Sequence, residues 1–137
     1  MVFRSSAGGT RDVVITQRDI RQVQLAKGAI RAGIDLILEQ AGMTAGDLEE
    51  ILLAGAFGNY ISKMSAVRIG LLPAIPPERI RFVGNAALTG AKMALLSCQA
   101  RADAEQIRRK SVHLDLAGLP AFADAFADAM SFPGVQS

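Results

Sequence analysis

The sequence predicts an α/β domain whose sheet is mostly parallel and flanked by helices. Two segments, 51–70 and 80–96, each show an apolar strand that runs into a glycine turn and then a helix. Strands that alternate with helices are typical of parallel pairing, because the helix carries the chain back along the sheet. Half of the 137 residues are apolar and a fifth are charged, which is sufficient for one buried core.

The first forty residues indicate a lead-in followed by one long helix. Residues 1–12 are rich in Ser, Gly and Thr, so we expect a flexible lead-in or linker there. A short β-branched run over 13–15 precedes Thr16 and Asp19, which have the spacing of a capping box. Apolar residues then recur at helical spacing as far as Gly42, a glycine in the position of a left-handed cap. This helix should span about 25 residues.

Two glycines inside this helix, Gly28 and Gly33, lower its intrinsic propensity. We interpret them as places where another element packs closely against the helix. The unbroken apolar run 51–54 predicts a strand that is buried on both faces.

Apolar runs, capping residues and turn signals predict the remaining elements. They are a short capped turn at 44–47, a helix over 62–70, a proline-rich connector over 73–77, a strand over 80–83 and a helix over 86–96. A helical segment over 101–110 is either a separate helix or a continuation of the helix over 86–96. An edge strand over 112–116 follows, and then a closing helix after Pro120 with Phe122, Phe126 and Met130 on one stripe.

Composition excludes several classes of function. Fifteen Lys and Arg against 13 Asp and Glu leave a net charge of +2, so no nucleic-acid footprint is indicated. The only cysteine, Cys98, excludes a disulfide framework and a four-cysteine metal or iron–sulfur site within this chain. The only histidine, His113, excludes a multi-histidine zinc centre. No apolar run is long enough to span a membrane and no signal peptide is recognisable, so we expect a cytoplasmic domain.

The glycine turn after the first predicted strand is a candidate ligand site. Ligands of open α/β sheets lie beyond the carboxyl ends of the strands, where Gly55 and Gly58 remove side chains. The next helix would also offer free N–H groups to a phosphate. Phe57 either lies against a purine or fills the core. Alternatively, the glycines serve only tight turning and helix packing, and a pattern this short does not decide between the two.

The second glycine turn, over 84–91, is denser in small residues. Gly84, Asn85 and Gly90 either face a ligand or leave room for another helix to cross closely, as in a hinge or an interface. The spacing alone favours the crossing helix. Neither turn ends in the Lys-Ser/Thr pair of a Walker sequence.

No catalytic residue is assigned in this chain. We interpret Cys98 as an inert thiol, Asp19 as a cap, and Asp115 and the basic run 108–110 as solvated. His113 alone, on a predicted edge strand, does not form a nucleophile–base pair.

Several longer motifs resemble one family, the reductive activators of corrinoid proteins, in their C-terminal part. The similar segments, in order and spacing, are 15–20, 25–27, 53–61, 69–73, 83–87 and 122–133. The resemblance covers roughly residues 13–133, and several motifs are long enough to be specific.

The resemblance implies half of a ribonuclease-H-like ATPase domain of the acetate and sugar kinase, heat-shock-70 and actin superfamily. Members couple ATP, with Mg²⁺, to lifting an electron onto cob(II)alamin, and a [2Fe–2S] ferredoxin domain supplies that electron. The residues that the resemblance implies are Gly55, Ala56, Phe57 and Gly58 for the adenosine side of the nucleotide, and Gly84, Asn85 and Gly90 for the hinge helix between the two halves.

The same resemblance implies that residues 13–133 form a C-terminal subdomain and 134–137 a tail. The ferredoxin cysteines, the phosphate loops and the acidic magnesium residues are not in this chain. We therefore expect an upstream ATPase half, a ferredoxin domain and a corrinoid protein as partners, with the iron–sulfur cluster bound only by the parent and no turnover by this chain alone. The chain has Leu88 where the family's hinge usually has glycine, and Ser62-Lys63 where it has Asp-Pro. The alternative hypothesis is a protein-interaction or dimerisation module that has lost nucleotide binding.

Overall fold

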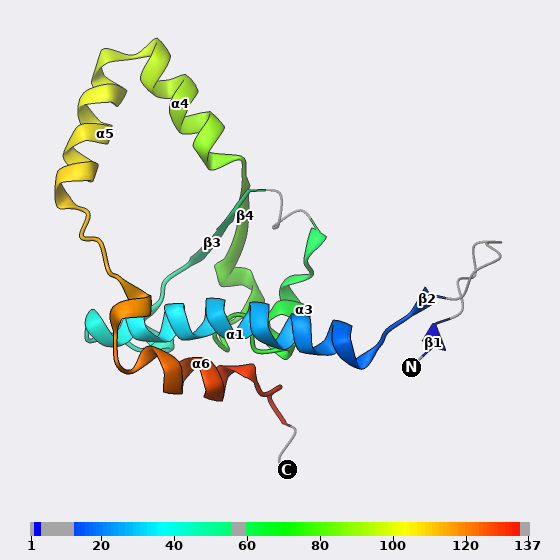
Figure 1. Cartoon of the computed structure of the whole chain (residues 1–137). Helices are drawn as coiled ribbons and strands as arrows, with labels where there is room; N and C mark the ends of the chain where they lie inside the picture. Colours follow the sequence, from blue (N-terminus) through cyan, green and yellow to red (C-terminus); the bar gives the residue numbers. More distant parts are fainter. Residues whose placement is uncertain (1, 4–12, 56–59, 135–137) are drawn as a thin grey trace.

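The computed structural model describes residues 2–3, 13–55 and 60–134, arranged as helices around a small parallel sheet (Figure 1). The elements are β1 (Val2–Phe3), β2 (Val13–Val14), α1 (Gln17–Gln40), η1 (Ala45–Asp47), β3 (Ile51–Ala54), α3 (Lys63–Arg68), η2 (Pro77–Arg79), β4 (Ile80–Gly84), α4 (Ala86–Leu96), α5 (Cys98–Lys110), η3 (Leu116–Gly118) and α6 (Phe122–Met130). β1 pairs with β2 in antiparallel fashion, and β3 pairs with β4 in parallel fashion. Most of residues 1–12 lie outside the described part, so the lead-in stays a prediction.

The long helix α1 begins and ends where the sequence predicts. Asp19 donates its backbone N–H to the Thr16 side chain, and the Asp19 carboxylate accepts the Thr16 backbone N–H at 2.8 Å, which is a capping box. At the other end Gly42 has φ +65°, and the Met43 N–H donates to the Leu38 carbonyl, as in a Schellman motif. Both predicted ends are confirmed.

The sheet is buried on one face only, so the prediction for 51–54 is wrong in that respect. Ile51 and Leu53 pack against the core, whereas Leu52, on the opposite face of β3, is exposed. Successive side chains of a strand point to opposite faces, and within the described part of the chain only one of them is covered.

A cluster of core residues lies between α3 and β4. Its buried residues are Ala66, Leu71, Leu72, Ile75 and Ile80, of which only Ile75 falls in the predicted connector 73–77. Ala66 comes from α3 and Ile80 begins β4, so the connector fills the space between helix and strand. Proline signals marked the turns correctly but did not reveal that the apolar residues beside them are buried.

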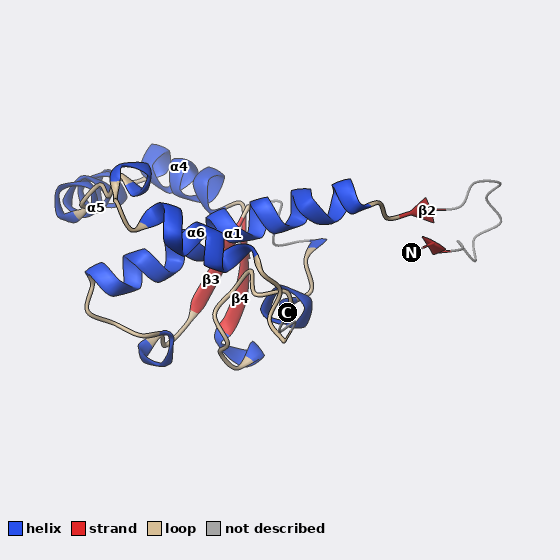
Figure 2. Cartoon of the chain, turned by 60° about the horizontal axis from the view of Figure 1, so that its bottom comes forward, coloured by secondary structure: helices blue, strands red, loops and turns tan. Residues whose placement is uncertain are grey.

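Helix α6 lies alongside α1, which confirms the close packing expected at Gly28 and Gly33 (Figures 1 and 2). A Cβ at Gly28 would lie 3.0 Å from Met130 Cγ, and one at Gly33 would lie 3.1 Å from Leu116 Cδ1. Phe122 and Phe126 stack on α6 with ring centroids 6.0 Å apart, on the predicted stripe. Glycine is needed in α1 because another side chain occupies the space of its missing Cβ.

Residues 112–116 do not form the predicted edge strand. They run as irregular chain into η3, where the Asp115 side chain accepts the Gly118 N–H, and Val112 is 91% exposed. The alternation predicts a strand, but Leu114 and Leu116 lead instead into the 3-10 turn η3, where Leu116 packs against Gly33 of α1. His113 is exposed.

Helices α4 and α5 are separate, joined at Ser97. This settles the choice that the pattern over 101–110 left open. No described helix combines the length and the apolar character needed to cross a bilayer.

Candidate functional site

The carboxyl ends of β3 and β4 lie side by side and carry the two predicted glycine turns. Gly55 and Gly84 have φ values of +83° and +64°, a region that favours glycine. The Gly55 N–H donates to the Gly84 carbonyl at 2.6 Å, so the two turns form one site.

A bulge in β4 brings these glycines together. Leu53 pairs with Phe82, but Ala54 pairs with Gly84, so Val83 is the extra residue. A bulge of this kind bends the strand and redirects the chain that follows. Here it places Gly84 next to the turn that leaves β3.

The described residues leave space beside the backbone at this edge. Among residues 13–55 and 60–134, no heavy atom lies within 4 Å of where a Cβ on Gly55 or Gly84 would stand. Tight packing explains the glycine at position 28 but not the glycines at 55 and 84. For these two, positive φ is the feature that favours glycine. Ala56, Phe57 and Gly58, the other predicted nucleotide contacts, lie outside the described residues, so their roles stay predictions.

The hinge residues have clear local roles. Asn85 is the N-cap of α4, and its side-chain oxygen accepts the Leu88 N–H at 3.0 Å. Gly90 faces open space, since a Cβ there would meet nothing within 4 Å. No second helix crosses α4 at Gly90 within residues 13–55 and 60–134, so the crossing stays a prediction about other parts of a longer protein.

Two aromatic residues lie close in sequence to the glycine turns. Phe82 precedes Gly84 by two residues on β4, and the Lys63 ammonium, at the start of α3, lies 5.4 Å from the centroid of its ring. Tyr60, which follows the glycine turn of β3, is exposed. Among the described residues no group of three His, Cys, Asp or Glu side chains could hold a metal.

A second polar centre, which sequence reasoning did not single out, is built around Lys27 on α1. Lys27 is only 2% exposed, and its ammonium donates to the carbonyls of Ala129 at 2.6 Å and Ser131 at 2.5 Å. It also lies 5.2 Å from the centroid of the Phe132 ring. Burial and the neighbouring Arg31 lower the pKa of Lys27. Helix α6 has no basic residue in its own last turn, so Lys27 supplies that charge from α1.

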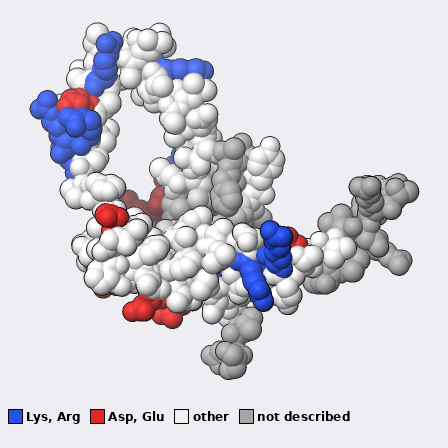
Figure 3. Space-filling model, in the orientation of Figure 1, with Lys and Arg blue, Asp and Glu red and all other residues white. Residues whose placement is uncertain are grey.

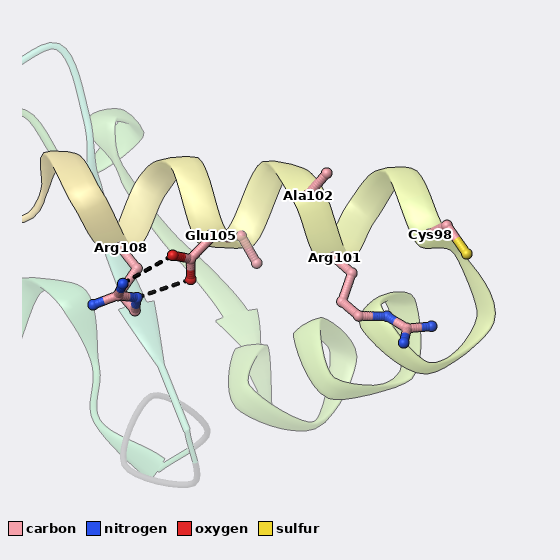
Figure 4. Close-up of a pocket in the computed structure, with 6 residues that line it drawn as sticks. Cys98, Arg101, Ala102, Glu105 and Arg108 are labelled. Atoms are coloured by element: carbon pink, nitrogen blue, oxygen red, sulfur yellow. Dashed lines mark hydrogen bonds and ion pairs between the residues drawn. The ribbon is translucent and has the colours of Figure 1, made fainter.

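Two hollows lie away from the glycine edge. One of about 520 Å³ adjoins Lys27, and its wall includes Arg31, Asp35 and Asp128. Another, of about 610 Å³, runs along α5, where Figure 4 shows Arg101, Glu105 and Arg108 on one side of the helix. Glu105 accepts from Arg108 and Arg109, and these bonds lower the pKa of Glu105. Residues 108–110 are all exposed, which confirms the solvated face predicted for them.

The fold is a mixed α/β domain with two positive-φ glycines at the carboxyl edge of two parallel strands. A family model described as the "C-terminal domain of RACo the ASKHA domain" matches residues 1–137. The chain therefore belongs to this family.

Individual relatives agree with this assignment. The chain is 47% identical over 116 residues to the corrinoid activation enzyme RamQ of Eubacterium limosum, covering 85% of this chain and 20% of that protein. It is 29% identical to the [Co(II) methylated amine-specific corrinoid protein] reductase of Methanosarcina barkeri, covering 88% of this chain and 22% of that one. A solved structure, the reductive activator for corrinoid,iron-sulfur protein, matches with a TM-score of 0.82 and 33% identity over 96% of this chain and 23% of its own. The chain thus spans about a fifth of the length of these relatives.

Proposed function

We propose that this chain supplies the adenosine side of the nucleotide cleft in an ATP-dependent reductive activator of a corrinoid protein. The single observation that carries the proposal is the edge at Gly55 and Gly84, where two positive-φ glycines share a hydrogen bond and no described side chain fills the space of their missing Cβ atoms. Similarity also supports the proposal, because the chain belongs to the RACo C-terminal family and its relatives are named as corrinoid activators.

The residues present fit a purine nucleoside. A side chain at either glycine would occupy the space beside the two strand ends, so their absence leaves room for a flat ligand. Gly55 and Gly84 would hold the nucleoside by close backbone approach, and Ala56, Phe57 and Gly58 are the further contacts that we propose. ATP, with Mg²⁺, would supply the free energy of binding and hydrolysis that favours a closed clamp over an open one.

The iron–sulfur cluster does not fit this chain, because its one cysteine, Cys98, cannot provide four thiolate ligands. We therefore assign the electron donor to another segment of the parent. Within this chain, α4 transmits closure of the clamp, with Asn85 fixing its first turn and Gly90 leaving room for a crossing helix.

A second candidate function is a protein-interaction or dimerisation module without nucleotide. The observation in its favour is the large exposed apolar surface of α4, which has no buried residue.

Nucleotide binding by the full-length protein separates the two candidates. We expect Gly55→Val to weaken ATP binding, measured by equilibrium dialysis, at least about tenfold. Gly42→Val is the matched control, since Gly42 also has positive φ and open space but lies at the far end of α1. The control carries similar strain and should leave the dissociation constant unchanged.

Equal loss of binding in the two variants would point to unfolding and not to a site. ATP binding that persists in Gly55→Val at the wild-type level would remove the nucleotide proposal. ATP-dependent reduction of the corrinoid protein, followed by its absorbance, should fall in parallel with binding.

A further inference from the structure

The chain that follows α6 packs against the end of α3. Gly70 comes directly after Ile69, the C-cap of α3, and is buried. A Cβ at Gly70 would lie 2.9 Å from Pro133 Cγ and 3.0 Å from Pro133 Cδ, which is too close for any side chain. The proline ring therefore occupies the space that a side chain at the end of α3 would need.

This contact is not explained by helix capping alone, as a comparison with Gly42 at the end of α1 shows. Both glycines close a Schellman motif, in which the N–H of the following residue donates at 2.9 Å to a carbonyl of the last helical turn. Their φ values are +74° at Gly70 and +65° at Gly42. Among the described residues, nothing lies within 4 Å of a Cβ at Gly42, whereas Gly70 faces Pro133.

Lys27 of α1 fastens the same segment. Its ammonium donates to the carbonyls of Ala129 and Ser131, on either side of the end of α6, and lies 5.2 Å from the centroid of the Phe132 ring. It would also lie 3.5 Å from a Cβ at Gly70. One buried ammonium thus meets both the C-terminal segment and the end of α3.

Arg31, one helical turn after Lys27, holds the chain that follows Gly70. Its Nη1 donates to the Leu72 carbonyl at 3.2 Å, while its Nε donates to Asp35 at 2.8 Å. Helix α1 therefore supplies two cations, one turn apart, to the place where α3 ends and the C-terminal segment crosses it.

At its other end α3 leads back to the glycine turns. Only residues 56–62 separate Gly55 from α3. The Lys63 ammonium, in the first turn of α3, lies 5.4 Å from the centroid of the Phe82 ring, two residues before Gly84. A connection this short limits how far the chain after Gly55 can move independently of α3.

We propose that Lys27, Phe132 and Pro133 form a clasp that fixes α3 on α1 and thereby positions the chain leaving Gly55 for the nucleotide. This inference rests on the proposed function, since it concerns the same cleft. The three are positioning residues, because they act through α3. A binding segment that is already in place loses less conformational freedom when the ligand binds. If only a fraction of the molecules held α3 in place, the apparent dissociation constant would rise by the inverse of that fraction.

The double substitution Phe132→Ala with Pro133→Ala tests the clasp without altering α3. Hydrogen exchange of the full-length protein is measured by mass spectrometry without nucleotide. We expect the amides of α3 to exchange about tenfold faster, while those around Ala32 and Leu36 in α1 keep their wild-type rate. Equilibrium dialysis should give an ATP dissociation constant about fivefold higher. The unchanged middle of α1 separates this result from a general loss of stability.

Other variants sharpen the test. Phe132→Tyr retains the ring beside Lys27 and should match the wild type in exchange and in ATP binding. Gly70→Ala, which meets the Pro133 ring, should weaken ATP binding as the double substitution does, and it serves as a second variant if that protein fails to fold. Gly42→Ala strains the same kind of cap far from the clasp and should leave the dissociation constant unchanged.

Three outcomes would overturn the proposal. Fast exchange of α3 in the wild type means that the clasp does not hold it. Slow exchange of α3 in the double variant means that the core around Ala66 holds it alone. Faster exchange of α3 with an unchanged ATP dissociation constant means that the clasp is structural and does not position the site. A wild-type protein that binds no ATP would instead remove the proposed function, and exchange would still decide whether the clasp holds α3.

Discussion

The body of the molecule, formed by α1, β3, α3, β4 and α6, differs from the arm, formed by α4 and α5, in how its helices are held. The arm stands away from the body in the space-filling view (Figure 3). In the body, α6 contacts α1 closely enough that Gly28 has no room for a side chain, and Lys27 is buried between them. In the arm, α4 and α5 contact each other but neither buries a residue. The body is stabilised by its own packing, whereas the arm has its shape set mainly by caps and local hydrogen bonds.

This difference teaches that secondary structure and tertiary burial need not coincide in one domain. Ser97 and Asn85 define the ends of the arm helices as well as Thr16 defines α1. Capping specifies where a helix begins, but most of the free energy that stabilises a helix in a protein comes from tertiary packing. Substitutions in the two regions should therefore have very different effects on the free energy of unfolding.

The largest effect should come from the core. Ile80→Ala removes a side chain that is fully buried, so we expect the 137-residue chain to lose about 2–5 kcal/mol of unfolding free energy. Leu96→Ala, the same kind of truncation in the arm, should change it by less than about 0.5 kcal/mol. Urea unfolding of both variants measures the contrast, and equal losses would contradict it.

The glycines of the two regions offer a contrast of intermediate size. Gly28→Val places a branched side chain against Met130 and Phe126, and we expect a loss of about 1–3 kcal/mol from overpacking. Gly90→Val meets open space, so it should be nearly neutral or gain a few tenths of a kcal/mol from helix propensity. Thermal unfolding by circular dichroism distinguishes them. A destabilised Gly90→Val would show that something already packs on the arm.

Lys27 tests whether the body depends on its buried charge. Lys27→Met keeps the length of the side chain but leaves the carbonyls of Ala129 and Ser131 without their donor, at a cost of about 1–3 kcal/mol. Arg18→Met, on an exposed turn of the same helix, should change stability by less than about 0.5 kcal/mol. Proteolysis should also cut α6 faster in Lys27→Met. An unchanged melting temperature in Lys27→Met would show that apolar packing alone keeps α6 against α1.

The smallest effect concerns the acid range. Hydrogen bonds from Thr16 lower the pKa of Asp19 below its ordinary value of 3.8, and those from Thr44 do the same for Asp47. A folded-state pKa below the unfolded one gives stability that is complete above pH 3.8 and lost as the pH falls through the lowered value. Asp19→Asn should flatten this acid loss in a melting-temperature titration. Identical curves for the wild type and Asp19→Asn would contradict the prediction.

Local signals in the sequence predicted the elements of the fold well. The cap at Thr16, the glycine at Gly42 and the apolar runs of β3 and β4 all lie where local rules place them, because these features depend on neighbours in the chain. The false strand over 112–116 and the unpredicted core at Leu71 and Leu72 depend on distant packing. Alternation and proline content do not report which surface the folded chain covers.

The candidate site was predictable only in part. Gly55 and Gly84 could be placed at strand ends, and parallel pairing brings such ends together. The bulge at Val83, which aligns them, leaves no mark in the sequence. Lys27 was also missed, since a lone lysine among small and apolar residues looks like one on a solvated face until α6 is seen to cover it.

The contact from Lys27 to Ala129 joins residues 102 positions apart, and this separation bears on how the protein is made. On the ribosome α1 emerges long before α6 is synthesised. The Lys27 ammonium must therefore stay hydrated while most of the chain is made. Pairing of α1 with α6 then closes a loop of about a hundred residues. We therefore expect nascent chains stalled before residue 122 to leave the surface of α1 at Gly28, which Phe126 and Met130 cover in the folded chain, accessible to chaperones.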